Sequence, residues 1–126
     1  MDWPNIIKNA RARVAPYIRQ TPIVTFETGI LASPVALKLE QLQHAGSFKT
    51  RGAFNTLLGT APPAAGLVAA AGGNHGAAVA YAAQKLGFPA RVYVPDIAGP
   101  EKISLIRACS AELQGVRGAH SKALEH

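Results

Sequence analysis

The beginning of the chain shows the spacing of an amphipathic helix. Ile6, Ala10 and Val14 recur every four residues, which places their apolar side chains on one face of a helix. We expect this helix to cover residues 4–17, and we expect Pro16 to end or kink it because proline has no backbone N–H.

Beyond this helix, short apolar runs alternate with longer segments of helical periodicity. The runs typical of strands lie at 23–26, 35–39, within 66–71, at 91–94 and at 112–116. The predicted helices cover 48–58, with Ser47 as a candidate N-cap, then 74–86 and 100–109. Residues 118–126 resemble the start of a further helix. From residue 35 onward the order is β-α-β-α-β-α-β, which predicts an α/β fold with a small, open, mostly parallel sheet and flanking helices.

Composition supports a packed globular chain. The 126 residues are 48% hydrophobic and 16% charged, enough apolar material for a core and too little charge for disorder. No apolar stretch reaches the length of a membrane-spanning helix, so we expect no membrane partner. Residues 1–5 lack the pattern of a secretory signal, and Cys109 is the single cysteine, so we expect a cytoplasmic protein.

The net charge of +6 raises the question of nucleic acid as a partner. The basic residues are scattered along the chain, and only 6% of residues are aromatic, so no platform for stacking bases is evident. We therefore expect no nucleic-acid partner. A basic module that binds only phosphate stays open as an alternative.

A lysine stands at the start of a predicted helix within residues 46–53 (GSFKTRGA). The partial positive charge of a helix N-terminus disfavours an ammonium group at Lys49, and Phe48 would help to exclude water from it. A neutral amine is the nucleophile that Schiff-base chemistry needs. An ordinary surface lysine is the structural alternative.

A glycine-rich turn at residues 72–76 (GGNHG) follows an apolar strand and opens a helix. Glycines let backbone N–H groups approach an anion, so a phosphate or carboxylate is the expected guest. The turn matches neither the dinucleotide fingerprint nor the Walker loop, and a plain turn remains the alternative. Because helix N-termini gather at one edge of a parallel sheet, we expect Lys49 and this turn to face one crevice.

Residues 40–53 (EQLQHAGSFKTRGA) and 73–76 (GNHG) together resemble the N-terminal signatures of fold-type II pyridoxal-phosphate enzymes. Within that group the chain is most similar to threonine/serine dehydratases and serine racemases, and the similarity extends to 10–22 (ARARVAPYIRQTP) and 81–90 (YAAQKLGFPA). The resemblance implies a pyridoxal 5′-phosphate cofactor held covalently by Lys49, which would also move the substrate's α-proton.

The resemblance implies roles for the neighbouring residues as well. Phe48 would pack against the cofactor ring, and Asn74 would donate a hydrogen bond to the cofactor's 3′-oxygen. The substrate carboxylate would bind the loop formed by Ala71, Gly72, Gly73, Asn74 and His75. His75 is expected to orient groups near the cofactor rather than to bind metal, since no second ligand stands at metal spacing.

Two positions in this loop depart from the family pattern. Ala71 lacks a hydroxyl that commonly helps to bind the carboxylate, and Gly72 stands where racemases place a serine that acts as second acid/base. The resemblance therefore favours dehydration and deamination of threonine or serine, giving a 2-oxo acid and ammonia, over racemisation. The alternatives are a non-catalytic, self-associating fragment and another ammonia-lyase acting on a related β-hydroxy amino acid.

The resemblance also implies an organisation for the chain. Residues 1–34 would carry a helix and a strand that join a larger domain, and residues 35–126 would form the small α/β domain with the cofactor lysine. Enzymes of this family are about twice as long or more, so the chain is expected to be a fragment of a homo-oligomeric enzyme that acts on a small amino acid.

Overall fold

The computed structural model describes residues 1–27, 29–30, 33–60 and 62–116. The helices are α1 (Trp3–Val14), α2 (Lys49–Gly59), α3 (Asn74–Leu86) and α4 (Pro100–Ala108). The strands are β1 (Ile23–Phe26), β2 (Val35–Lys38), β3 (Leu67–Ala70), β4 (Ala90–Pro95) and β5 (Glu112–Val116). Three short 3₁₀ helices cover Ala15–Tyr17, Glu40–Leu42 and His44–Gly46. The helix expected to begin near 118 lies outside the described residues.

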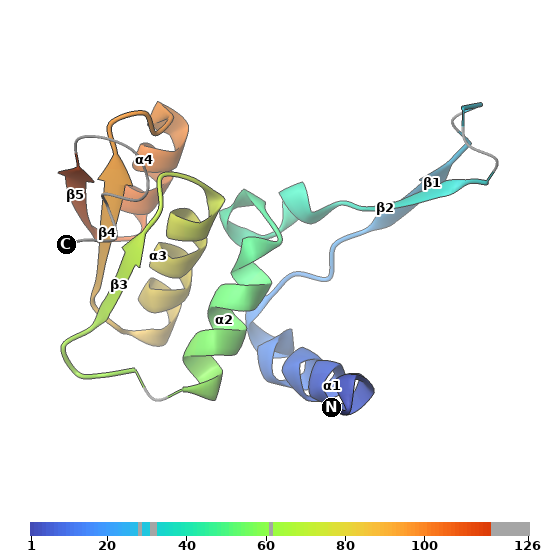
Figure 1. Cartoon of the computed structure of the whole chain (residues 1–126), viewed down its shortest axis with the longest axis horizontal. Helices are drawn as coiled ribbons and strands as arrows, with labels where there is room; N and C mark the ends of the chain where they lie inside the picture. The colour runs from blue at the N-terminus through green and yellow to red at the C-terminus, as the bar shows by residue number, and fades with distance from the viewer. Residues whose placement is uncertain (28, 31–32, 61, 117–126) are drawn as a thin grey trace.

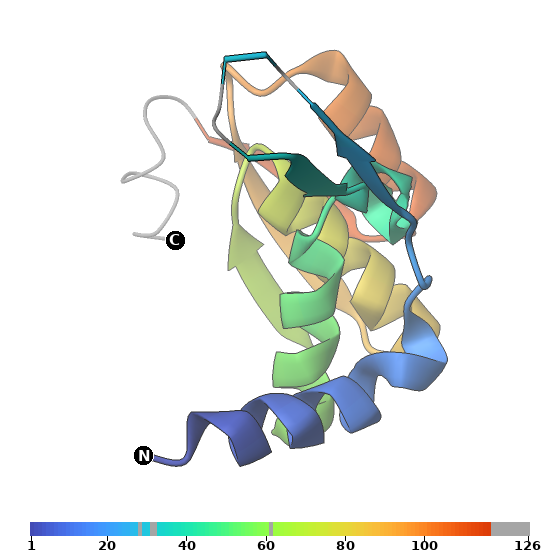
Figure 2. The same cartoon turned by 90° about the vertical axis from the view of Figure 1, so that its right-hand side faces the viewer.

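A three-stranded parallel sheet forms one end of the molecule, in the order β3-β4-β5. α3 connects β3 to β4 and α4 connects β4 to β5, so each crossover contains a helix, as parallel pairing requires. α3 lies between the sheet and α2, and α1 packs against α2 (Figures 1 and 2). The α/β class with a small parallel sheet and flanking helices is therefore confirmed.

The strand expected at 35–39 does not join this sheet, and in this respect the prediction is wrong. β2 pairs antiparallel with β1, Ile23 opposite Lys38 and Phe26 opposite Val35, and the hairpin projects away from the helices (Figure 1). A short connection can join antiparallel strands directly, whereas a parallel partner requires a long crossover. Alternation of strands and helices predicts the connections but not the partner of each strand. The expected domain boundary between residues 34 and 35 coincides with the start of β2, and that division of the chain stays a prediction.

Small residues let α3 lie close to both of its neighbours. Ala77, Ala78, Ala80, Ala82 and Ala83 are almost completely buried and occupy more than one side of the helix. On one side the core contains Val92, Val94 and Ile106 from the sheet and α4; on the other it contains Val14, Ala53 and Phe54 from α1 and α2. Alanine side chains permit close helix packing, so the N-terminus of α3 is held between the sheet and α2.

The ends of the helices follow local chemistry with one exception. α1 ends at Val14 and continues as a 3₁₀ turn that contains Pro16, as expected, and Gly87 ends α3 in the left-handed conformation at φ 75°. Ser47 does not cap α2, contrary to expectation. The N-cap is Phe48, which has helical backbone angles, while Ser47 is extended and its buried Oγ has no hydrogen-bond partner among the described residues.

Glu40 ties the hairpin to α2. Its carboxylate accepts hydrogen bonds from Arg51 Nε at 2.8 Å and Arg51 Nη2 at 2.7 Å, and from Thr21 Oγ1 at 2.6 Å. These contacts, led by the hydrogen bond from Arg51, lower the pKa of Glu40 from 4.5 to about 2. The ion pair is half-buried, so it fixes the entry to α2 more firmly than a surface pair would.

We expect the Glu40 network to make folding stability depend on acidity. Because the pKa of Glu40 is lower in the folded chain, its contribution is present above about pH 4.5 and is lost as the pH falls towards 2. Glu40→Gln should cost roughly 1–3 kcal/mol at pH 7 and very little at pH 2. Denaturant unfolding at both pH values measures this, with Glu101→Gln, an exposed carboxylate on α4, as control. Equal losses at both pH values would contradict it.

Candidate functional site

Lys49 and His75, which come from the two chemistry-bearing motifs, line the same cavity. Its volume is about 470 Å³, within the usual range for cofactor and substrate pockets. α2, β3 and α3 supply its walls, and the remaining lining residues are Gly52, Ala53, Thr56, Leu57, Leu67, Val68, Ala69 and Val79. The expectation that the lysine and the glycine-rich turn face one crevice is therefore met for Lys49 and His75.

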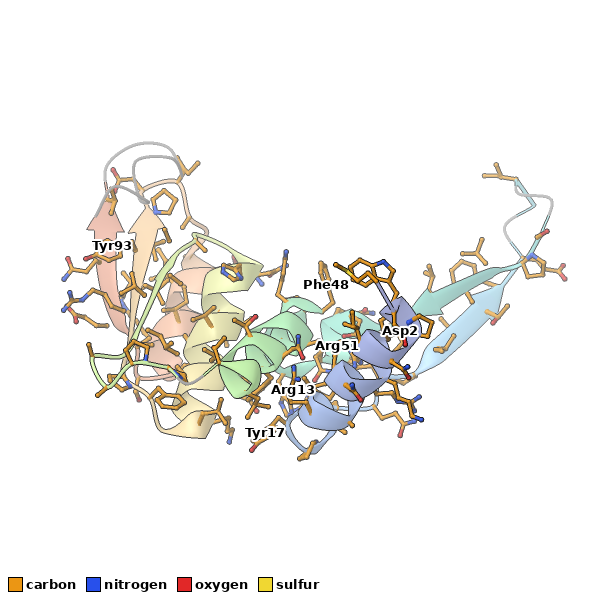
Figure 3. The ribbon with its side chains drawn as sticks, turned by 60° about the horizontal axis from the view of Figure 1, so that its bottom comes forward. Asp2, Arg13, Tyr17, Phe48, Arg51 and Tyr93 are labelled. Atoms are coloured by element: carbon orange, nitrogen blue, oxygen red, sulfur yellow. The ribbon has the colours of Figure 1, made fainter. Side chains whose placement is uncertain are left out.

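Lys49 presents an exposed primary amine at this cavity. The side chain is exposed at the first residue of α2, and its Nζ lies 5.1 Å from the centroid of the Phe48 ring. Among the described residues, no carboxylate or hydrogen-bond acceptor pairs with Nζ. Phe48 itself is 59% exposed and projects from the surface at the start of α2 (Figure 3). The geometry leaves the amine available for reaction with a carbonyl group.

The loop 71–75 connects the edge strand β3 to α3. Ala71 is buried, and its N–H already donates to the carbonyl of Tyr93 at 3.0 Å, so this amide belongs to the sheet. Gly73 is the N-cap of α3, and Asn74 and His75 form its exposed first turn. The first N–H groups of a helix have no partner within it, so those following Gly73 offer the loop's capacity for an anion.

Gly72 in this loop and Gly76 in the first turn of α3 each stand where a neighbouring group leaves little room for a Cβ atom. A Cβ on Gly72 would lie 2.9 Å from Pro95 Cδ and 3.0 Å from Ala98 Cβ, so the turn after β4 packs onto this position. A Cβ on Gly76 would lie 2.5 Å from the carbonyl oxygen of Ala71. The first contact holds the loop against the end of β4, and the second holds the first turn of α3 against the residue that follows β3. The N–H groups at the start of α3 are thus fixed by packing.

Several cavity residues are missing from the prediction made on the sequence. Gly52, Ala53 and Thr56 lie on the face of α2 that carries Lys49, and Val79 lies one turn after His75 on α3. Helical spacing of three, four and seven residues from the two motif residues is the signal that points to them. Asn74 is exposed beside His75 but is not among the residues that line the cavity.

Comparison with known families decides the identity of this arrangement. Residues 14–126 match the family model described as "Pyridoxal-phosphate dependent enzyme". The chain belongs to the pyridoxal-phosphate dependent enzyme family. The match contains both motifs, and the cofactor of this family is pyridoxal phosphate.

The relatives that match this chain include dehydratases, a deaminase and racemases of amino acids. The chain is 41% identical to phenylserine dehydratase of Ralstonia pickettii over 112 residues, which is 85% of this chain and 34% of the relative. The T.th. threonine deaminase structure superposes with a TM-score of 0.83 at 39% identity, covering 96% of this chain and 39% of that one. The maize serine racemase structure gives 0.85 at 31% identity, covering 96% and 38%. The chain spans about a third of the length of the curated relatives it matches.

The described residues suit the aldehyde group and the pyridine ring of the family's cofactor, pyridoxal phosphate. The aldehyde of pyridoxal phosphate requires a primary amine, and Lys49 offers one at a cavity whose walls include Leu57, Val68 and Val79. Apolar walls suit a pyridine ring. Among these residues no cluster of three or more histidine, cysteine or carboxylate side chains could hold a metal ion. No helix in the described part of the chain is long and apolar enough to cross a membrane.

Proposed function

We propose that this chain supplies the cofactor lysine and the carboxylate-binding loop of a dehydratase that acts on threonine, serine or a related β-hydroxy amino acid. The single observation that carries the proposal is the cavity shared by Lys49 and His75, since it joins an amine to a helix N-terminus. Relatives named phenylserine dehydratase and L-threonine dehydratase support this substrate class.

In this proposal each residue of the site has a defined role. Bound pyridoxal phosphate supplies the electron sink that chemistry at an amino-acid α-carbon requires. Lys49 holds the cofactor and moves the α-proton, and Phe48 covers one side of the amine and the ring. The N–H groups at the start of α3 bind the substrate carboxylate, with Asn74 and His75 beside them. Loss of the β-hydroxyl as water, followed by hydrolysis, gives a 2-oxo acid and ammonia.

The loop geometry favours dehydration over racemisation. A racemase needs a second acid/base group, and the serine that racemases place at position 72 is a glycine here. A side chain at position 72 would collide with Pro95 and Ala98. The loop therefore cannot hold a second acid/base side chain there unless Pro95 or Ala98 moves. The similarity to the serine racemase structure supports a shared fold. Gly72 supports a reaction in which Lys49 is the only acid/base group at the α-carbon.

We further propose that the exposed apolar residues of α1 and the hairpin contact additional protein surface. Trp3 is 59% exposed, Ile7 63% and Ile23 64%, and exposed apolar side chains that gather on one surface mark protein–protein contacts. A homo-oligomeric enzyme and a cytoplasmic location remain part of this proposal. Sedimentation of the chain at several concentrations tests the association.

The experiment is an assay for 2-oxo acid release. The purified chain is incubated with pyridoxal phosphate and, separately, with threonine, serine and phenylserine. We expect a 2-oxo acid that depends on both cofactor and β-hydroxy amino acid. If the cofactor attaches to Lys49 but none of the three substrates releases 2-oxo acid, the dehydratase proposal is wrong for this chain and the non-catalytic alternative is supported.

A further inference from the structure

A second cavity lies between α1, residues 18–20 and the face of α2 that carries Arg51. Its volume is about 380 Å³, and it shares no lining residue with the cavity at Lys49. Three of its lining residues are uncharged: Ala15, Ile18 and Gln20. The others are all cationic: Arg11, Arg19, Lys38 and Arg51. Among the described residues no carboxylate lines this cavity, which separates it from the mixed-charge surface of an ordinary soluble protein.

Two of these cations are held in place by the Glu40 network. Arg51 donates two hydrogen bonds to Glu40, at 2.8 and 2.7 Å, so its guanidinium plane is fixed. Lys38 Nζ donates to the carbonyl oxygen of Thr21, whose hydroxyl donates to Glu40. Arg51 lies on the side of α2 that faces α1, as Figure 3 shows. A ligand that binds here meets groups that are already ordered, which lowers the entropic cost of binding.

A buried glutamine fixes the backbone of the third cation. Gln43 is 2% exposed; its Oε1 accepts from the N–H of Arg19 at 2.8 Å, and its Nε2 donates to the carbonyl of Arg19 at 2.8 Å. The Arg19 side chain also donates from Nη1 to the carbonyl of Leu42 at 3.1 Å. Three segments distant in the sequence thus hold basic side chains around one space.

Within residues 1–27, 29–30, 33–60 and 62–116, the positive charge of this cavity is not balanced. Among the described residues, Glu40 pairs with Arg51, and its single negative charge does not balance the four cations that line the cavity. Arg11, exposed on α1, has no carboxylate or hydrogen-bond partner in that part of the chain. Like charges gathered around a concave surface focus a positive potential there. A multivalent anion would relieve this repulsion.

We propose that this cavity is a binding site for a small phosphate-bearing anion, separate from the site at Lys49. A phosphate group carries up to two negative charges on oxygens that match guanidinium forks, and three of the four cations are arginines. The volume accommodates the phosphate with a small organic part. An acidic peptide is less suited, because it would need cations spaced along an extended groove. This inference does not depend on the proposed dehydratase activity.

The test is a titration of the isotope-labelled chain with inorganic phosphate at constant ionic strength, followed by amide NMR. We expect saturable shifts centred on residues 11, 19, 38 and 51. Arg11→Gln should weaken phosphate binding about tenfold without altering the fold, because the Arg11 side chain makes no hydrogen bond or ion pair with the described residues. Arg11→Lys should recover part of the affinity. Arg107→Gln, which removes an exposed arginine from α4, is the matched control and should bind as the parent does.

Three outcomes would overturn the proposal. Arg11→Gln and Arg107→Gln could weaken binding equally, which would indicate a general charge effect. The shifts could be confined to the amides at the start of α3, which would assign phosphate to the loop beside Lys49. A short polyglutamate peptide could bind the same residues more tightly than phosphate, which would make the cavity a docking site for acidic protein. Because the readout is binding, failure of the dehydratase assay leaves this result unaffected.

Discussion

Replacing Lys49 with alanine is expected to abolish specific attachment of pyridoxal phosphate to the chain. Among the residues that line the 470 Å³ cavity, Lys49 offers the primary amine, and its Nζ lies over the Phe48 ring. A cavity that holds the aldehyde beside this amine makes their reaction effectively intramolecular, so labelling there should exceed that of surface lysines by about two orders of magnitude. Borohydride reduction followed by peptide mass mapping measures the loss.

Lys85 provides a matched control for this experiment. Its Nζ lies 5.7 Å from the centroid of the Tyr81 ring, and its side chain is exposed, as is that of Lys49. It lies in the last turn of α3 and does not line the cavity. Lys85→Ala should therefore leave the labelling of Lys49 unchanged. Labels spread evenly over several lysines in the parent chain would show that Lys49 is an ordinary surface residue.

The sequence was most informative where glycine and proline restrict the backbone. Gly59 ends α2, Gly87 ends α3 in a left-handed conformation, and Pro16 stands in the 3₁₀ turn that follows α1. These positions depend on local conformational limits, so the residues themselves predict them. The partner of β2 depends instead on the length of the connection and on what the neighbouring strands cover, and the sequence pattern carried no signal for it.

The same distinction applies to the cavity. Lys49 and His75 were expected to meet because each stands at a helix N-terminus, and they line one cavity even though β2 is absent from the parallel sheet. Lys49 and His75 line one cavity because α2 packs against α3 through small residues such as Ala53 and Ala78. Such packing depends on contacts between distant parts of the chain, which local sequence patterns do not predict. The same reason explains why Ser47 does not cap α2: its hydroxyl is buried and bonds to none of the helix N–H groups.

Gly76→Ala is the second substitution with a large expected effect, because a Cβ atom at Gly76 would meet close neighbours whereas one at Gly52 would not. In a helix interior, alanine is normally favoured over glycine by about 1 kcal/mol. Gly76 lies in the first turn of α3, so propensity alone predicts that Gly76→Ala stabilises the chain. A Cβ there would lie 2.5 Å from the carbonyl oxygen of Ala71 and 3.0 Å from Val92 Cγ1, and neither group belongs to a flexible side-chain end. The steric clash should reverse the sign.

We therefore expect Gly76→Ala to destabilise the chain by about 3 kcal/mol in denaturant unfolding, because α3 must move away from β3. Gly52→Ala is the matched control: Gly52 also lies within a helix, and a Cβ there meets nothing within 4 Å. The control should be neutral or stabilising by up to about 1 kcal/mol. If both variants gained stability, the close approach of α3 to β3 would be wrong. Because that approach also aims the first N–H groups of α3, Gly76→Ala should weaken carboxylate binding at the loop, whereas Gly52→Ala should leave those N–H groups in place.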